Sequence, residues 1–169
     1  MVRTLVNRSA KVWDKPDSGI WEYRGEPRHF VFSKLMNWVA MDRAGQIAKF
    51  IGKIKYAEQC FQRASVIRED ILTKGWNAEK EAFTMYYGSS QADASVLLML
   101  HYGFLEQDDP RMIKTIEFCY RELMKDGYVM RYTQDDDFGK PQNAFILCTF
   151  WMVKALYLTG KKEEARELF

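Results

Sequence analysis

The sequence predicts an all-α fold made of about three αα-hairpins of a helical barrel or toroid. Helices that are apolar around most of their circumference alternate along the chain with helices that are apolar on one face, which is typical of an inner ring within an outer ring. Long loops lead into the apolar helices and short loops lead out of them. Because short loops join antiparallel neighbours, we expect the long loops to gather at one end and to carry the active site there.

The first hairpin follows a loop over residues 13–30, which prolines and glycines interrupt. Residues 1–12 fit the tail of a preceding helix. The helix over about 31–51 is apolar on most sides, because alanines fill much of the circumference between the larger apolar residues. After a short turn, the helix over about 56–74 carries a single apolar stripe and ends at Gly75.

The second and third hairpins repeat the order of long loop, apolar helix and amphipathic helix. Asp93 opens the second apolar helix and is expected to cap it. Asp109 and Pro110 are a strong start for the next helix, and AFTMYY at 82–87 fits a short strand. The expected segments are the loops 76–90 and 127–142, and helices from near Gln91 to Gly103, over about 110–126, over about 143–159 and from Lys161 onward.

Composition argues against several functional classes. The net charge is +2, from 25 basic and 23 acidic residues, so there is no electrostatic basis for binding nucleic acid or a membrane. No apolar run reaches the ~18 residues of a membrane span, and no signal peptide is visible. Three cysteines without Cys-x-x-Cys spacing indicate buried thiols in the cytoplasm. The two histidines are far apart, so neither a metal site nor a cofactor is predicted.

The loop before the first apolar helix contains the main candidate for a catalytic residue. Glu22 lies between Trp21 and Tyr23 and is followed by several cations. A carboxylate between aromatic rings can have a raised pKa and serve as an acid, although nearby arginines act in the opposite direction. The alternative is that Glu22 forms an ion pair with Arg24 or Arg28 and only stabilises the loop.

Four segments resemble the glucoamylase–trehalase family, glycoside hydrolase family 15: PDSGIWEYRGEPRHFVFSKLMNWVAMDRA, QADASVLLMLHYGFLEQDDPRM, DGYVMRY and NAFILCTFWMVKALYLTGKKEEARELF. The resemblance covers nearly the whole chain. It implies an (α/α)6 barrel, a toroid of six hairpins. Residues 1–169 would then be a partial glycosidase domain that is truncated at both ends.

The resemblance also assigns roles to single residues. It places the general acid at Glu22, in the Ile-Trp-Glu motif, and it suggests that Arg131 holds the glucose in the first subsite. The general base of relatives would follow Phe169, so the fragment would lack it and be inactive alone. Glucoamylases have a second, substrate-binding glutamate where this chain has Tyr23, so the choice among α-glucosides stays open.

Further side chains are candidates for binding the terminal glucose. Planar guanidinium groups suit neighbouring sugar hydroxyls, which favours Arg28 and Arg131. His29 and Gln142 are further polar candidates, and Trp21 would wall the pocket as a stacking surface. The alternative for the cations is a structural ion pair, and for the ring it is ordinary packing.

The sequence therefore predicts an inverting, exo-acting hydrolase that releases glucose from α-glucosidic bonds, similar to glucoamylase or trehalase. Its partner would be a disaccharide or oligosaccharide. Two alternatives stay open: a non-catalytic saccharide-binding or regulatory module on the same scaffold, and a structural αα-repeat protein. We also expect the isolated fragment to self-associate through exposed apolar helices.

Overall fold

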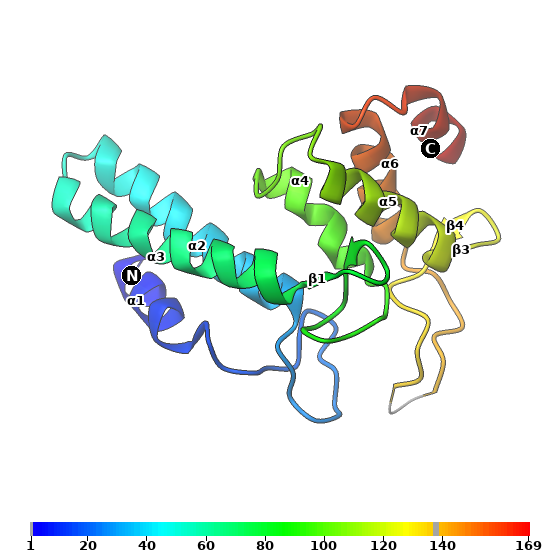
Figure 1. Cartoon of the computed structure of the whole chain (residues 1–169), viewed down its shortest axis with the longest axis horizontal. Coiled ribbons are helices and arrows are strands. Elements are labelled where there is room, and N and C mark those ends of the chain that lie inside the picture. Colours follow the sequence, from blue (N-terminus) through cyan, green and yellow to red (C-terminus); the bar gives the residue numbers. More distant parts are fainter. Residues whose placement is uncertain (1, 137–138) are drawn as a thin grey trace.

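The computed structural model describes residues 2–136 and 139–169, which form a predominantly helical chain (Figure 1). Two small β-hairpins accompany the helices. The helices are α1 (Val2–Val12), α2 (Val31–Phe50), α3 (Ile54–Lys74), the short 3₁₀ helix η1 (Ala94–Leu97), α4 (Leu98–Tyr102), α5 (Pro110–Leu123), α6 (Ile146–Leu158) and α7 (Lys162–Leu168). The strands are β1 (Trp76–Asn77), β2 (Ala82–Phe83), β3 (Met124–Lys125) and β4 (Tyr128–Val129), paired β1–β2 and β3–β4.

The helices pack in the alternating order that the hydrophobic pattern predicts. α3 packs along α2, α5 against η1, and α7 against α6, so each amphipathic helix covers an apolar one. η1 also contacts α2 and α6, which brings the apolar helices side by side. Leu35 and Met41 of α2 and Ile67 and Ile71 of α3 are fully buried in this core. The predicted arrangement of inner and outer helices is confirmed.

The long loops gather at one end of the molecule, at the lower side of Figure 1. Three contacts join them: a backbone bridge between Phe30 and Tyr86, a hydrogen bond from the Tyr23 hydroxyl to the Asp135 carbonyl (2.9 Å), and one from the Trp21 indole to Asp93. The short connections lie at the opposite side. The sequence therefore predicted correctly where the loops meet.

The second apolar helix begins later than predicted. It starts at Ala94 rather than near Gln91, as the 3₁₀ turn η1, because the Asp93 carboxylate accepts a hydrogen bond from the Ser95 backbone N–H (2.8 Å). The predicted capping role of Asp93 is confirmed. In the loop before it, the strand expected over 82–87 is limited to Ala82–Phe83.

Two other predicted helix ends were wrong. The helix expected over 110–126 ends at Leu123, because Asp126 and Gly127 have positive φ angles (51° and 81°) and form the two-residue turn of the β3–β4 hairpin. The helix expected over 143–159 begins at Ile146, since Phe145 is still extended.

The described chain has three buried, free cysteines, as the sequence predicts. None of the described helices is both long and apolar enough to cross a membrane. Several large apolar side chains of the loop end and α6 are exposed nevertheless. They are Phe145, Ile146, Leu147, Phe150 and Tyr157.

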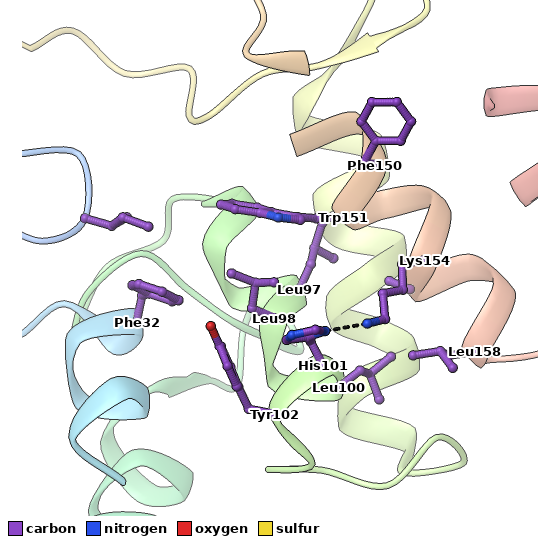
Figure 2. A pocket seen from close by; sticks show the side chains of 12 residues that line it. Phe32, Leu97, Leu98, Leu100, His101, Tyr102, Phe150, Trp151, Lys154 and Leu158 are labelled. Atoms are coloured by element: carbon purple, nitrogen blue, oxygen red, sulfur yellow. Dashed lines mark hydrogen bonds between the residues drawn. The ribbon is translucent and has the colours of Figure 1, made fainter. Parts of the chain in front are cut away.

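A cavity of about 360 Å³ opens between α2, η1–α4 and α6. Figure 2 shows Trp151 and Tyr102 reaching towards its centre, whereas Phe150 points away. A hydrogen bond joins the Lys154 ammonium and His101 Nδ1 at one side. Partial burial and the charge of Lys154 lower the pKa of His101. The cavity is thus mainly apolar, with one polar edge.

Candidate active site

The loop that carries Glu22 is fastened to the first turn of α2. The Asp17 carboxylate accepts a hydrogen bond from the Ser33 hydroxyl (2.7 Å). Lys34 is almost completely buried, and its ammonium donates to the Lys15 carbonyl (2.5 Å). Burial lowers the pKa of Lys34, and nearby carboxylates partly offset this effect. These bonds give the loop a defined path above the helix.

Glu22 occupies a strained and exposed position in this loop. Its φ angle is 53°, in the left-handed region that costs non-glycine residues ~1–2 kcal/mol. Within ranges 2–136 and 139–169, no hydrogen bond or ion pair engages its carboxylate, so the alternative of an ion pair with Arg24 or Arg28 is not observed. The Glu22 N–H donates to the Gly19 carbonyl (3.3 Å) and the Tyr23 N–H to the Ser18 carbonyl (2.8 Å), so this conformation closes a tight turn that presents the carboxylate at the loop surface.

Glu22 lines two adjoining cavities, which we call the Glu22 cleft. Their volumes are about 390 and 560 Å³. The first has polar walls that include Asp136 and Gln142, and the second has apolar walls that include Phe145 and Trp151. The residues that line both cavities are Trp21, Glu22, Arg131 and Asn143. The structure therefore brings together four predicted site residues: Trp21, Glu22, Arg131 and Gln142.

Trp21 is the centre of the aromatic wall of the Glu22 cleft. Its ring centroid lies 6.4 Å from Tyr132, 6.3 Å from Phe145 and 6.1 Å from Trp151. The Arg131 guanidinium lies 5.8 Å from the Trp21 ring centroid and 5.3 Å from that of Tyr132. Cation–π contacts of this kind restrict where a guanidinium can point. The cleft thus combines a flat aromatic surface with a fixed cation.

Asp93 lies directly behind this wall. Trp21 Nε1 donates to both carboxylate oxygens of Asp93, at 3.1 Å each. The side chain of Asp93 is only 1% exposed, and this burial raises its pKa to about 6, although the hydrogen bonds from Ser95 and Trp21 act in the opposite direction. A buried carboxylate thus connects the start of η1 to the residue before Glu22.

The raised pKa of Asp93 predicts a pH-dependent loss of stability that Asp93→Asn should remove. The pKa of Asp93 is 3.8 in the unfolded chain and about 6 in the folded protein, so this carboxyl group lowers the unfolding free energy by ~3 kcal/mol above pH 6. Below pH 3.8 the effect disappears, because Asp93 is then protonated in both states. Between about pH 4.5 and about pH 7, the unfolding free energy of the Asn variant of the complete protein should therefore rise by ~2 kcal/mol relative to wild type. Chemical denaturation at both pH values measures this difference, and a constant difference would contradict the prediction.

Two tyrosines hold the loops on either side of the cleft. The Tyr23 hydroxyl donates to the Asp135 carbonyl, and the Tyr132 hydroxyl donates to the Asp136 carboxylate (2.5 Å). Burial and the bond to Asp136 raise the pKa of Tyr132. Gln142 is exposed in the same loop, and its amide donates to the Lys140 carbonyl (3.1 Å). The third long loop is thus tied to the loop of Glu22.

The structure does not bring Arg28 and His29 to the Glu22 cleft. The Arg28 guanidinium lies 4.4 Å from the ring centroid of Tyr86, and His29 stacks on Tyr87 at 5.7 Å with an interplanar angle of 15°. Partial burial, with the charge of Lys34, lowers the pKa of His29. Both side chains pack against the second long loop, so their predicted role in sugar binding has no support from this geometry.

Several residues that line the Glu22 cleft were not predicted from the sequence as site residues. Tyr132, Phe145 and Trp151 form walls of the cleft, and Asp136 adds a second carboxylate. Tyr132 follows Arg131 directly, so the Arg-Tyr pair was a usable signal. The hydrophobic pattern predicts Phe145 and Trp151 only as parts of an apolar helix, because periodicity does not distinguish a ring in the core from one at a cleft.

Comparison with known proteins identifies the family. The family model described as glycosyl hydrolases family 15 matches residues 1–168. The chain belongs to this family. Similar proteins include the trehalases of Mycolicibacterium smegmatis (39% identical over 171 residues) and Mycobacterium tuberculosis (40% identical over 171 residues). Both alignments cover 99% of this chain and 25% of the relative, so the chain spans about a quarter of their length.

Solved structures agree on the fold. A wild-type glycosidase and a glycosidase variant in complex with glucose each superpose with a TM-score of 0.82 at 19% sequence identity. The matches cover 98% of this chain and 43% of each of those chains. The predicted fold, that of the helical barrel of these glycosidases, is therefore confirmed, and the chain matches less than half of each of those chains.

Proposed function

We propose that the protein containing this chain hydrolyses an α-glucosidic bond with inversion, and that Glu22 is the general acid. The observation that carries the proposal is a carboxylate without a hydrogen-bond or ion-pair partner among the described residues, in a cleft with an aromatic wall and a fixed arginine. In a member of glycoside hydrolase family 15, this arrangement of a carboxylate, an aromatic wall and an arginine suits the hydrolysis of a glycosidic bond. Glu22 would donate its proton to the glycosidic oxygen while the bond to the anomeric carbon breaks.

The base is proposed to come from outside these 169 residues. Inversion needs a second carboxylate ~6.5–9.5 Å from the acid, which activates a water on the opposite face of the sugar. The other carboxylate of the described cleft is that of Asp136, which already accepts a hydrogen bond from Tyr132. This engagement makes Asp136 a poorer candidate than a residue of the rest of the protein.

Arg131, Trp21 and Gln142 are proposed to bind the terminal glucose. The Arg131 carbonyl accepts a hydrogen bond from the Ala94 backbone N–H (2.9 Å), which holds this residue at the cleft. Its guanidinium can donate to two neighbouring hydroxyls. Trp21 offers an apolar face for the sugar ring, and Gln142 offers both a donor and an acceptor.

We propose α,α-trehalose as the first substrate to test. Trehalases from bacteria and archaea, including that of Thermoplasma volcanium at 36% identity, match this chain over 99% of its length. The hydroxyl of Tyr23, which stands where glucoamylases have a second glutamate, is used to tie two loops together. This supports a compact site for a disaccharide.

Proton NMR of the complete protein with trehalose, maltose and isomaltose tests the function. Inversion releases one α-glucose and one β-glucose from each trehalose, because only the attacked carbon changes configuration. Equal early signals of the two anomers, before they interconvert, are the expected result. Release of α-glucose alone would overturn inversion, and no glucose from any sugar would favour the non-catalytic saccharide-binding module.

The isolated 169-residue chain should be run in parallel. We propose that it releases no glucose, because the base is absent, and that it self-associates. The exposed apolar side chains of α6 support association. Sedimentation velocity would show species larger than a monomer, and a clean active monomer would overturn both statements.

The expected location in the cytoplasm stays a prediction.

A further inference from the structure

We propose that Asp93 is a positioning residue for the catalytic acid. The Asp93 carboxylate binds the Trp21 indole and so holds the segment that carries Glu22. The backbone N–H of the next residue, Ala94, binds the Arg131 carbonyl and so holds Arg131. This inference rests on the proposed roles of Glu22 and Arg131. Asp93 itself cannot touch the substrate, because its side chain is only 1% exposed.

The burial of Asp93 needs a reason beyond helix capping. Among the residues that the structure describes, it is the one buried carboxylate, and no lysine, arginine or histidine there forms an ion pair with it. A serine, threonine or asparagine would cap η1 equally well without placing an acidic group in the interior. Capping uses only Oδ1, through the Ser95 N–H, whereas the Trp21 indole uses both oxygens.

The bond to the indole restrains the backbone beside the acid. The single N–H of Trp21 lies 3.1 Å from each oxygen of Asp93, which fixes the direction of the ring. The flanking rings of Tyr132, Phe145 and Trp151 limit its other movements. Glu22 follows directly, in a left-handed conformation that persists only where its surroundings hold it.

The same short segment also anchors the cation of the cleft. The backbone N–H of Ala94, directly after Asp93, donates to the Arg131 carbonyl at 2.9 Å. The Cys119 thiol of α5 contacts the Asp93 carbonyl from behind, at 3.8 Å. Asp93 and Ala94 thus connect the proposed acid and the proposed glucose-binding arginine to one rigid helix start. Displacement of this segment would change the distance between the two functional groups.

A double-mutant cycle in the complete protein tests this coupling. Asp93→Asn keeps the shape and one acceptor but loses the second acceptor oxygen, and Trp21→Phe keeps a ring but loses the donor. We expect each single variant to lower kcat about 10- to 100-fold, with a smaller change in KM, because the acid is displaced rather than removed. If Asp93 acts through Trp21, Asp93→Asn should change kcat less than about twofold in the Trp21→Phe background.

Thr115→Val is the matched control for general loss of stability. The Thr115 hydroxyl is buried, accepts a hydrogen bond from the Phe83 N–H (3.1 Å) and lies outside the Glu22 cleft. Its loss should lower the thermal midpoint and leave kcat unchanged. Additive effects of Asp93→Asn and Trp21→Phe, or an unchanged kcat in a folded Asp93→Asn protein, would overturn the proposal.

A second readout does not depend on turnover. In protein labelled with 5-fluorotryptophan, the ¹⁹F signal of Trp21 is identified by its loss in Trp21→Phe. Asp93→Asn should shift or broaden this signal, whereas Thr115→Val should not. If wild-type protein cleaves none of the three sugars, the proposed function fails, and an altered Trp21 signal then still supports the anchoring role. An unchanged signal would overturn that role whether or not the protein is active.

Discussion

Replacement of Glu22 by glutamine is expected to lower kcat of the complete protein about 10²- to 10⁴-fold, the range that a general acid contributes. Glutamine has the shape of glutamate but no proton to give to the leaving oxygen. KM should change little, since the side chain is exposed at the cleft and its neighbours are not disturbed. Initial rates with the substrate found by NMR measure the effect.

Two comparisons distinguish loss of the general acid from a general loss of folding or stability. Glu26→Gln changes another exposed carboxylate of the same loop and should leave kcat unchanged. α-Glucosyl fluoride, whose leaving group needs little protonation, should be hydrolysed by Glu22→Gln with a much smaller loss than the natural substrate. A near-wild-type rate on the natural substrate would remove Glu22 from the mechanism.

Replacement of Arg131 by alanine is expected to lower kcat/KM about 10- to 100-fold and to weaken inhibition by glucose by a similar factor. Hydrogen bonds to a charged group contribute ~1.5–3 kcal/mol, and loss of one or two of them from the first subsite accounts for this range. Arg131→Lys should recover only part of the loss, because an ammonium cannot donate to two hydroxyls in a fixed plane. Inhibition constants for glucose provide the measurement.

Arg68→Ala is a matched control for Arg131. Its guanidinium also lies over an aromatic ring, 5.3 Å from the centroid of Phe104, and donates to the Phe104 carbonyl (3.4 Å). Arg68 belongs to the outer helix α3 and is outside the Glu22 cleft. Glucose inhibition should stay at the wild-type value in this variant. Equal losses in both arginine variants would indicate a stability effect and would remove Arg131 from the binding site.

The helical framework could be predicted because its signals are local. Asp109 and Pro110 start α5 where the sequence indicates, since a cap and a proline act on neighbouring backbone groups. The ends of other helices were less predictable. The end of α5 at Leu123 depends on the β3–β4 hairpin, and the late start of α6 at Ile146 has no signal in the hydrophobic pattern.

The site was predictable only in part. Glu22 and Arg131 were predicted from the resemblance, and Trp21 and Gln142 from their side chains. All four line one cleft, and their roles there stay predictions. Arg28, only six positions after Glu22, packs on Tyr86 instead. Neighbours in a loop can point in opposite directions, because the bends of the loop depend on its anchoring contacts with the rest of the protein.

The sequence by itself determined the alternating helical architecture and the candidate acid, because periodic burial and a distinctive motif are both written along the chain. Only the tertiary structure decided that Asp93 lies behind Trp21, although the two are 72 positions apart. Periodicity reports which residues are buried, but it does not report which partner a buried polar group will find. That choice depends on how three loops converge in space, so the link between Asp93 and the segment of Glu22 emerges only in the folded protein.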